Sequence, residues 1–342
     1  MLKNKEIAKM LNISPTAVSL ALNNKAGVSE ETRQRVIALR NGSMAADYNE
    51  MMQSNINAPQ LLLLVIKKHG DVISETPFFM SLSETLHQQS AMEGFGLQAY
   101  YTKPHEDLQK CLYSINFARY EGILVLATEA DQKDIEIIRR LGKPVLIIDS
   151  WVSGLDVDCV LMDNEQGVRQ AVRYAFSQGH RNIGYVGSYV HANNFSDRLF
   201  AYRGEIASLG LAYNPDVVYS IHSSLDGASR DMCKILEGKP ELPSVLICVN
   251  DMVAMGVMDA LTKFGYAIPG DISIIGFDNM TVSSHLNPPL TTVGFESRKI
   301  AKVSVSMLIK RIKEPKDSGF MRCLIGTQLH VRDSVSHLNA TT

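Results

Sequence analysis

The sequence contains no long apolar segment and no apolar leader. Its longest uninterrupted apolar run, Leu61–Ile66, is far too short to cross a bilayer and is followed by Lys67 and Lys68. Residues 1–25 are polar and amphipathic, unlike a secretory signal, in which a charged start precedes an apolar stretch. We therefore expect a cytoplasmic protein with no membrane partner.

The residues of common catalytic and metal sites are also scarce or badly spaced. The five cysteines include no C-x-x-C pair, and the nine histidines include no H-E-x-x-H, so the spacing predicts neither a disulfide framework nor a metal site. There is no G-x-S-x-G and no phosphate-binding G-K-[ST], and Gly94-Phe95-Gly96 follows a helical stretch rather than a strand. We expect no cofactor, no metal and no catalytic residues, hence no enzyme.

Charge is balanced over the whole chain but not along it. The net charge at pH 7 is −2, which by itself argues against a nucleic-acid partner. Up to Arg40, however, seven basic residues stand against three acidic ones, a net charge of +4. This asymmetry is a mild indication of an anion-binding head, although a basic stretch is usually only a solvated face.

Residues 1–40 have the pattern of three short helices. Asn4 can cap the first helix, and Ser14 can cap the second. Pro15 then stands at the first helical position, where its missing N–H costs no hydrogen bond. The second helix is predicted to run to Leu22, and Ser29 can cap the third.

The first two predicted helices have the spacing of a helix-turn-helix. A small residue (Ala8) is followed four places on by a turn former (Asn12) and six further on by an apolar residue (Val18). The outward residues of the second helix would then face the major groove; they are Thr16, Ala17, Ser19 and Leu20. From these residues alone, a small helical hairpin that binds no DNA remains the alternative.

From Leu61 onward, short apolar runs alternate with amphipathic helical stretches. Continuous apolar strands of this length, each followed by a helix, indicate buried parallel strands in an α/β fold. Two similar lobes account best for their number. The runs are Leu61–Ile66, Gly122–Leu126, Val145–Ile148, Ile183–Val186, Val245–Val249 and Ile272–Phe277.

Polar residues follow several of these runs. Asp149, Asn250 and Asp278 each stand directly after a predicted strand. Ligands of open α/β sheets bind at the carboxyl ends of the strands, and carboxylate and amide groups are suited to the hydroxyls of a polyol. Each residue, taken alone, has an ordinary alternative as the N-cap of the next helix.

Several motifs resemble the lactose/galactose repressor (LacI/GalR) family of bacterial transcription regulators, and together they span nearly the whole chain. In the head they are residues 5–8, 14–23 and 28–33. In the body they are residues 179–184, 249–256, 268–279, 289–293 and 331–334. The resemblance implies a DNA-binding regulator, a homodimer, and a small-molecule effector held between two lobes.

The implied fold is an all-α helix-turn-helix head joined to an α/β, two-lobed, periplasmic-binding-protein-like effector domain. We expect the head at residues 1–42, a linker at 43–59 and the effector domain at 60–342. Lobe 1 would take about 60–161 and 294–325, and lobe 2 about 162–290 and 326–342.

In the family, the residues just after the turn read bases in double-stranded operator DNA. By motif these are Pro15, Thr16 and Leu20, and the full set expected at the DNA is Lys5, Ser14, Pro15, Thr16, Ala17, Ser19, Leu20, Asn23 and Arg33. Many relatives carry polar or basic side chains at the base-reading positions, whereas Pro15 and Leu20 offer only apolar contact. The linker also lacks the family's hinge motif; Met51 or Met52 could serve as a minor-groove wedge, or the linker could be plain.

The resemblance also implies effector contacts. Asp278 is the expected anchor for ligand hydroxyls, Asn250 stands where a cleft amide lies, and Arg198 matches an arginine that can hold two ligand oxygens. Asp149, Trp151, Phe79 and His222 complete the set. For Phe79, Trp151 and His222, structural packing is an equal alternative.

We expect a sugar as the effector, with a nucleobase-type ligand as the second possibility. A solute-binding protein for sugar transport would share the two-lobed fold. The basic helix-turn-helix at the place of a secretory signal argues against that alternative.

Overall fold

The chain folds into two compact units, Met1–Pro59 and Gln60–Thr342. The structure, a computed structural model, describes residues 4, 7–8, 13–23, 25, 27–28, 32–33, 36 and 58–59 of the first unit, and residues 60–73, 78–151, 154–315 and 319–338 of the second. The predicted linker contacts of Met51 and Met52 lie outside the described residues. Among the described residues, no helix combines the length and apolar character needed to cross a membrane.

Most of the described residues of the N-terminal unit are helical. Helix α2 (Pro15–Leu22) begins after Ser14, whose side chain accepts a hydrogen bond from the N–H of Ala17 at 3.1 Å. The predicted cap and the proline at the first helical position are therefore confirmed. The buried core of this unit consists of Ile7, Ala8, Val18, Ala21 and Val36.

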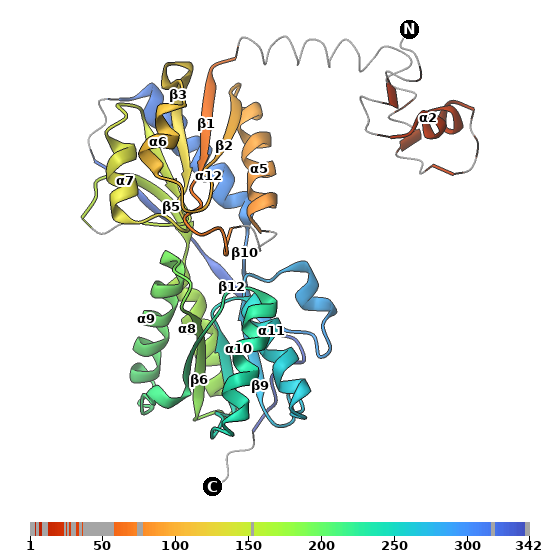
Figure 1. Ribbon diagram of the computed structural model, residues 1–342, viewed down its shortest axis with the longest axis vertical. Coiled ribbons are helices and arrows are strands. Elements are labelled where there is room, and N and C mark those ends of the chain that lie inside the picture. The colour runs from red at the N-terminus through yellow and green to blue at the C-terminus, as the bar shows by residue number, and fades with distance from the viewer. Residues whose placement is uncertain are drawn as a thin grey trace. The chain divides into compact units, whose positions relative to one another are not determined.

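The C-terminal unit contains two six-stranded sheets, one in each lobe (Figure 1). In lobe 1 the strand order is β11-β5-β4-β3-β1-β2, and every pairing is parallel. The strands are β1 (Gln60–Val65), β2 (Gly96–Tyr101), β3 (Tyr120–Leu126), β4 (Val145–Ile148), β5 (Asp158–Met162) and β11 (Arg322–Ile325).

In lobe 2 the order is β12-β10-β9-β8-β6-β7, parallel except for β12, which pairs antiparallel with β10. The strands are β6 (Ile183–Ser188), β7 (Val218–Ile221), β8 (Val245–Cys248), β9 (Ser273–Phe277), β10 (Thr291–Phe295) and β12 (Thr327–His330). All six predicted apolar runs are parallel strands of these two sheets, so the predicted α/β fold is confirmed.

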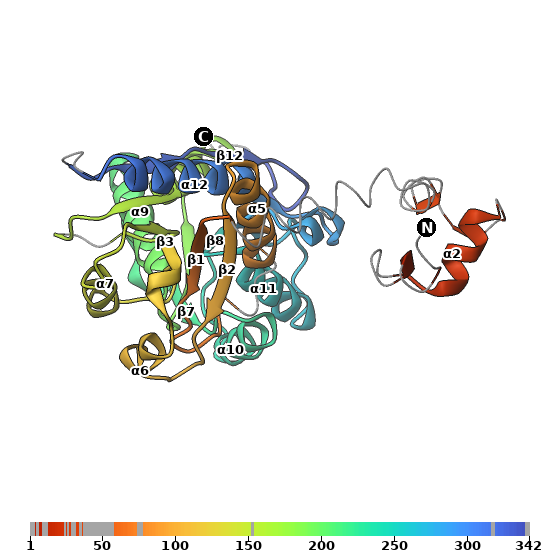
Figure 2. The same ribbon diagram turned by 90° about the horizontal axis from the view of Figure 1, so that it is seen from above.

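Helices cover both faces of each sheet. In lobe 1, α5 and α12 lie on one face and α6 and α7 on the other (Figure 2). The helices of this lobe are α5 (Phe78–Met92), α6 (Leu108–Tyr113), α7 (Gln132–Arg139) and α12 (Ser297–Lys313). Those of lobe 2 are α8 (Asn164–Ser177), α9 (Asn193–Ser208), α10 (Leu225–Glu237) and α11 (Asp251–Lys263), and 3-10 turns lie at Phe117–Arg119, Pro215–Val217 and Thr281–His285.

The chain passes between the lobes three times: from β5 to α8, from β10 to α12, and from β11 to β12. These strands occupy one edge of each sheet, which we call the hinge edge. Strands β1 and β2 of lobe 1, and β6 and β7 of lobe 2, lie at the opposite edge. A ligand that enters between the lobes from the side opposite the hinge edge would therefore pass the ends of β1, β2, β6 and β7, which we call the mouth.

Candidate effector-binding cleft and DNA-binding head

The polar residues that follow the predicted strands lie where the two lobes meet. Asp149 comes directly after β4, Asp278 directly after β9, and Asn250 two residues after β8. Asp149 and Asp278 adopt the left-handed backbone region, with φ values of 65° and 107°. This conformation is strained for a residue with a Cβ, and such strain gathers at ligand sites.

Asp149 joins the two lobes. Its buried carboxylate accepts a hydrogen bond from the Thr128 hydroxyl of lobe 1 at 2.6 Å. Asn194, the second residue of α9 in lobe 2, donates from Nδ2 to both carboxylate oxygens at 3.1 Å. Burial raises the pKa of Asp149 above its usual range, and these donors oppose the rise.

Arg198 of α9 is buried, with its guanidinium stacked on the Phe277 ring at 3.7 Å. It donates to Asn164 Oδ1 at 2.8 Å, to the carbonyl of Val249 at 2.6 Å and to Met162 Sδ at 3.2 Å. Its Nη2 lies 3.5 Å from Asp278 Oδ1. The arginine thus holds the ends of β8 and β9 together, and a direct contact with effector oxygens stays a prediction.

Asp278 lies among other ionisable groups, which shift its pKa. Burial raises its pKa to about 7, Arg198 opposes the rise, and the carboxylates of Asp251 and Asp149 add to it. The Arg198 guanidinium thus acts on the carboxylates of Asp278 and Asp149, whereas the guanidinium of Arg332 acts on that of Asp251. A neutral, hydroxyl-rich ligand can satisfy such groups without adding charge.

Asp251, which follows Asn250 after β8 and belongs to the same polar strand end, supports this arrangement. Its buried carboxylate accepts from the Met280 N–H at 2.8 Å and from the hydroxyls of Ser283 and Thr292 at 2.6 and 2.5 Å. It fixes the segment after β9, and burial raises its pKa to about 6. The neighbouring Asn250 caps α11 by accepting from the Val253 N–H at 2.9 Å, the alternative considered for it from the sequence.

The structure places the three predicted aromatic contacts in different surroundings. His222 follows β7, where Nδ1 accepts from the Ser224 N–H at 3.1 Å, and its ring lies 5.8 Å from that of Tyr189. Phe79 is buried in the core of lobe 1. Trp151 stacks on the Arg322 guanidinium at 3.8 Å and lines a pocket together with Asp197 of lobe 2. Phe79 and Trp151 are thus not brought to the Arg198–Asp278 group, and their ligand contacts stay predictions.

One segment of lobe 2, His191–Asn194, makes several hydrogen bonds to lobe 1. Asn193 donates from Nδ2 to the carbonyls of Ala127 and Ala130 and to the Ser150 hydroxyl, at 3.3, 2.8 and 2.7 Å. Its backbone N–H donates to the carbonyl of Thr128 at 3.2 Å. The α9 terminus is thereby fastened to the ends of β3 and β4.

In the head, four of the predicted DNA contacts are exposed: Ser14, Pro15, Thr16 and Asn23. Ala17, Ser19 and Leu20 are half-buried, and Lys5 lies outside the described residues. Arg33 donates to the carbonyls of Ala21 at 3.3 Å and Lys25 at 3.0 Å, so it ties the third helical segment to the end of α2. A phosphate contact of Arg33 stays a prediction.

Both parts of the chain match known families. Residues 4–41 match the model of bacterial regulatory proteins of the lacI family, and residues 172–335 match that of the periplasmic binding protein-like domain. The head of the chain therefore belongs to the lacI family of bacterial regulatory proteins. The fold inferred from the sequence, a helix-turn-helix head with a two-lobed domain, is confirmed.

Relatives of this lacI-family regulator match it along almost their whole length. The HTH-type transcriptional repressor PurR of Aliivibrio salmonicida is 26% identical over 91% of this chain and 92% of its own. The ribose operon repressor of Haemophilus influenzae is 26% identical over 92% of this chain and 93% of its own.

Solved structures agree in fold. The transcriptional regulator CelR–cellobiose complex matches with a TM-score of 0.73 and 20% sequence identity. The match covers 98% of this chain and 100% of that chain. The lac repressor dimer bound to operator and the anti-inducer ONPF has a TM-score of 0.72, with 18% identity, 98% of this chain and 99% of that chain covered. These structures bear on the fold; the lacI-family head and the periplasmic binding protein-like domain make the chain a DNA-binding transcription regulator with a ligand-binding domain.

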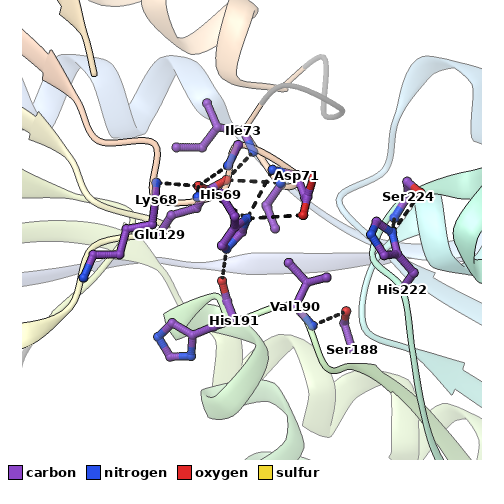
Figure 3. Close-up of polar contacts among 12 residues, drawn as sticks. Lys68, His69, Asp71, Ile73, Glu129, Ser188, Val190, His191, His222 and Ser224 are labelled. Carbon is purple, nitrogen blue, oxygen red and sulfur yellow. Dashed lines mark hydrogen bonds and ion pairs between the residues drawn. The ribbon is translucent and has the colours of Figure 1, made fainter. Parts of the chain in front are cut away.

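A further buried carboxylate of this lacI-family regulator was missed from the sequence. Glu129 is fully buried just after β3 and accepts five backbone N–H groups of the loop Lys68–Ile73, at 2.8 to 3.2 Å (Figure 3). The rule that selected Asp149 also applies to the polar pair Thr128-Glu129, since it follows the apolar run Gly122–Leu126. Asn193, by contrast, is the first residue of α9, and no sequence pattern marks it.

Proposed function

We propose that this chain is a cytoplasmic, homodimeric transcriptional repressor whose affinity for a near-palindromic operator is set by a sugar bound between its lobes. The observation that carries the sugar is the set of buried polar groups between the lobes. Asp149 and Asp278 come from opposite lobes, and Arg198 lies beside the latter. Hydroxyl groups, which both donate and accept, are suited to such groups when water is excluded.

The names of the similar proteins support the two parts of this proposal. The ribose operon repressor and the CelR–cellobiose complex are named with sugars, and the lac repressor structure is a dimer on its operator. A nucleobase-type effector is the second candidate, favoured by the planar rings of Tyr189 and His222, whose centroids lie 5.8 Å apart at the ends of β6 and β7.

A thermal-shift screen of the purified full-length protein against mono- and disaccharides, nucleobases and sugar phosphates tests the proposal. A ligand at 100 times its Kd stabilises the folded state by about 2.7 kcal/mol, which is easily detected. We expect a sugar to raise the Tm and to alter operator binding. A rise in Tm with nucleobases alone would show that the effector is a nucleobase and not a sugar. A ligand that binds but leaves DNA binding unchanged would not be the effector.

Asp278→Ala tests the location of the site. We expect this variant to lose the ligand-induced Tm shift and the ligand's effect on DNA binding, while its operator affinity without ligand stays that of the wild type. Unchanged ligand affinity would show that the effector binds elsewhere.

A further inference from the structure

The loop that follows β1 is held by an unusual anchor. Glu129 Oε2 accepts from the N–H groups of Lys68, His69 and Gly70, and Oε1 accepts from those of Val72 and Ile73. Backbone N–H groups that converge on one carboxylate form charge-assisted bonds in a concave nest. The conformation of residues 68–73 is therefore determined by a side chain from the end of β3.

This anchored loop presents His69 to the other lobe. His69 Nε2 lies 2.8 Å from the carbonyl oxygen of His191, and Nδ1 accepts from the N–H of Asp71 at 3.1 Å. Because a carbonyl can only accept, Nε2 donates in this bond, and Nδ1 also lies 3.7 Å from Asp71 Oδ2 and 3.5 Å from Glu129 Oε2. Figure 3 shows the ring extending from the loop toward His191.

The His69–His191 bond lies on the side of the lobes away from the hinge edge. His69 follows β1 and His191 follows β6, and both strands lie away from the hinge edge of their sheets. The Arg198–Asp278 group lies nearer the hinge edge, because Asp278 follows β9, third from that edge. The His69–His191 bond therefore crosses between the lobes on the mouth side of the group expected to bind the effector.

We propose that His69 closes the mouth of the cleft and thereby limits the length of ligand that it admits, and that Glu129 is the positioning residue that holds His69 in place. This inference deepens the proposed function and rests on it for the site, but the bond itself can be tested without a ligand. A ligand confined to the inner site leaves the bond intact. A longer ligand that reaches the mouth must displace it.

Hydrogen–deuterium exchange of the full-length protein, with no ligand added, tests the bond. His69→Leu removes the donor. The Asn193 amide, which donates across the lobes to the Thr128 carbonyl, should then exchange about two- to tenfold faster, the factor that corresponds to the loss of one net hydrogen bond. His69→Gln keeps a donor near Nε2 and should restore slow exchange. His191→Ala is the matched control, since it removes an exposed side chain but keeps the accepting carbonyl.

Glu129→Gln tests the positioning role. This variant keeps the shape of the side chain but places an N–H₂ group against N–H donors, so the amides of residues 68–73 should exchange at least about tenfold faster. In Glu129→Gln, the Asn193 amide should exchange as fast as it does in His69→Leu. The assignment is overturned if His69→Leu exchanges like the wild type, if His191→Ala exchanges as fast as His69→Leu, or if Glu129→Gln leaves residues 68–73 protected.

Ligand length is tested by calorimetric titration with D-ribose, D-glucose and cellobiose as probes. The ratio of disaccharide to monosaccharide affinity should rise about two- to tenfold in His69→Leu and stay at the wild-type ratio in His191→Ala. An unchanged ratio in His69→Leu would refute the length limit. If neither the wild type nor His69→Leu binds any of these sugars, the proposal of a sugar effector is refuted. The exchange measurements would still test the His69–His191 hydrogen bond.

Discussion

At the scale of single residues, the cleft depends on buried charges that share a few partners. Asp149, Asp251 and Asp278 are acids whose pKa values are raised by burial, and Arg198 is the cation that opposes the rise at Asp278. Buried charges of this kind destabilise the folded state, and proteins commonly keep such destabilising groups at their binding sites.

Asp278→Asn should change how stability depends on pH. The native pKa, about 7, lies above the ordinary value of 3.8, so between these pH values the native state keeps a proton that the unfolded chain releases. This stabilisation is complete below pH 3.8 and is lost as the pH rises through 7, by up to roughly 1.4 kcal/mol per pH unit.

Chemical denaturation at pH 5 and pH 8 measures this effect. The wild type should lose more stability than Asp278→Asn between the two values, while the exposed Asp333→Asn should behave as the wild type. Equal losses in the wild type and Asp278→Asn would show that Asp278 ionises normally.

Arg198→Lys should destabilise the protein by about 3 kcal/mol, because one ammonium group cannot replace a fork that bonds to Asn164, Val249 and Asp278. Arg203→Lys, an exposed change in the same helix, should stay within about 0.5 kcal/mol of the wild type. Urea denaturation measures both, and a mild effect of Arg198→Lys would show that the buried fork contributes little.

At the scale of elements, the central strands were predictable and the edge strands were not. Runs such as Val145–Ile148 are buried on both faces, so their sequences are continuously apolar. Strand β2 (Gly96–Tyr101) is only partly buried, and β12 (Thr327–His330) is largely polar. Neither strand therefore has the continuous apolar sequence by which the central strands were predicted. The antiparallel pairing of β12 depends on a return from the other lobe, which no local pattern encodes.

The same distinction applies to the site. Asp149, Asn250 and Asp278 could be found because parallel strands end at a common edge. The cross-lobe role of Asn193 and the Glu129-anchored loop depend on how the two lobes meet, which strand patterns do not specify.

The α10–α11 contact gives a test at this scale. A Cβ added at Gly256 of α11 would lie 2.5 Å from the Leu225 carbonyl and 2.6 Å from Ala228 Cβ, so the helices would have to separate. Gly256→Ala should destabilise the protein by about 1–3 kcal/mol. Gly204→Ala in α9, where no atom lies within 4 Å of the added Cβ, should be neutral or stabilise by up to about 1 kcal/mol. Thermal denaturation of both variants measures the difference, and equal Tm values would contradict the packing.

At the scale of the whole molecule, control of DNA binding requires that a ligand favour one arrangement of the lobes. The sole tryptophan reports on that arrangement, since Trp151 of lobe 1 lines a pocket together with Asp197 and Phe200 of lobe 2. A ligand that moves the lobes should shift the Trp151 emission, and Trp151→Phe should abolish the signal. A bound ligand that leaves the emission unchanged would contradict lobe movement at this pocket.

The central claim is that the chain binds one DNA sequence under ligand control. In vitro selection from random double-stranded DNA with the full-length protein tests it most directly, repeated with the sugar that raises the Tm most. The account predicts enrichment of an inverted repeat, with half-sites about one helical turn (~10 base pairs) or a multiple apart, and a ligand-dependent change in affinity of about 5- to 150-fold. Binding without enrichment of any sequence, or an affinity that the ligand does not alter, would contradict it.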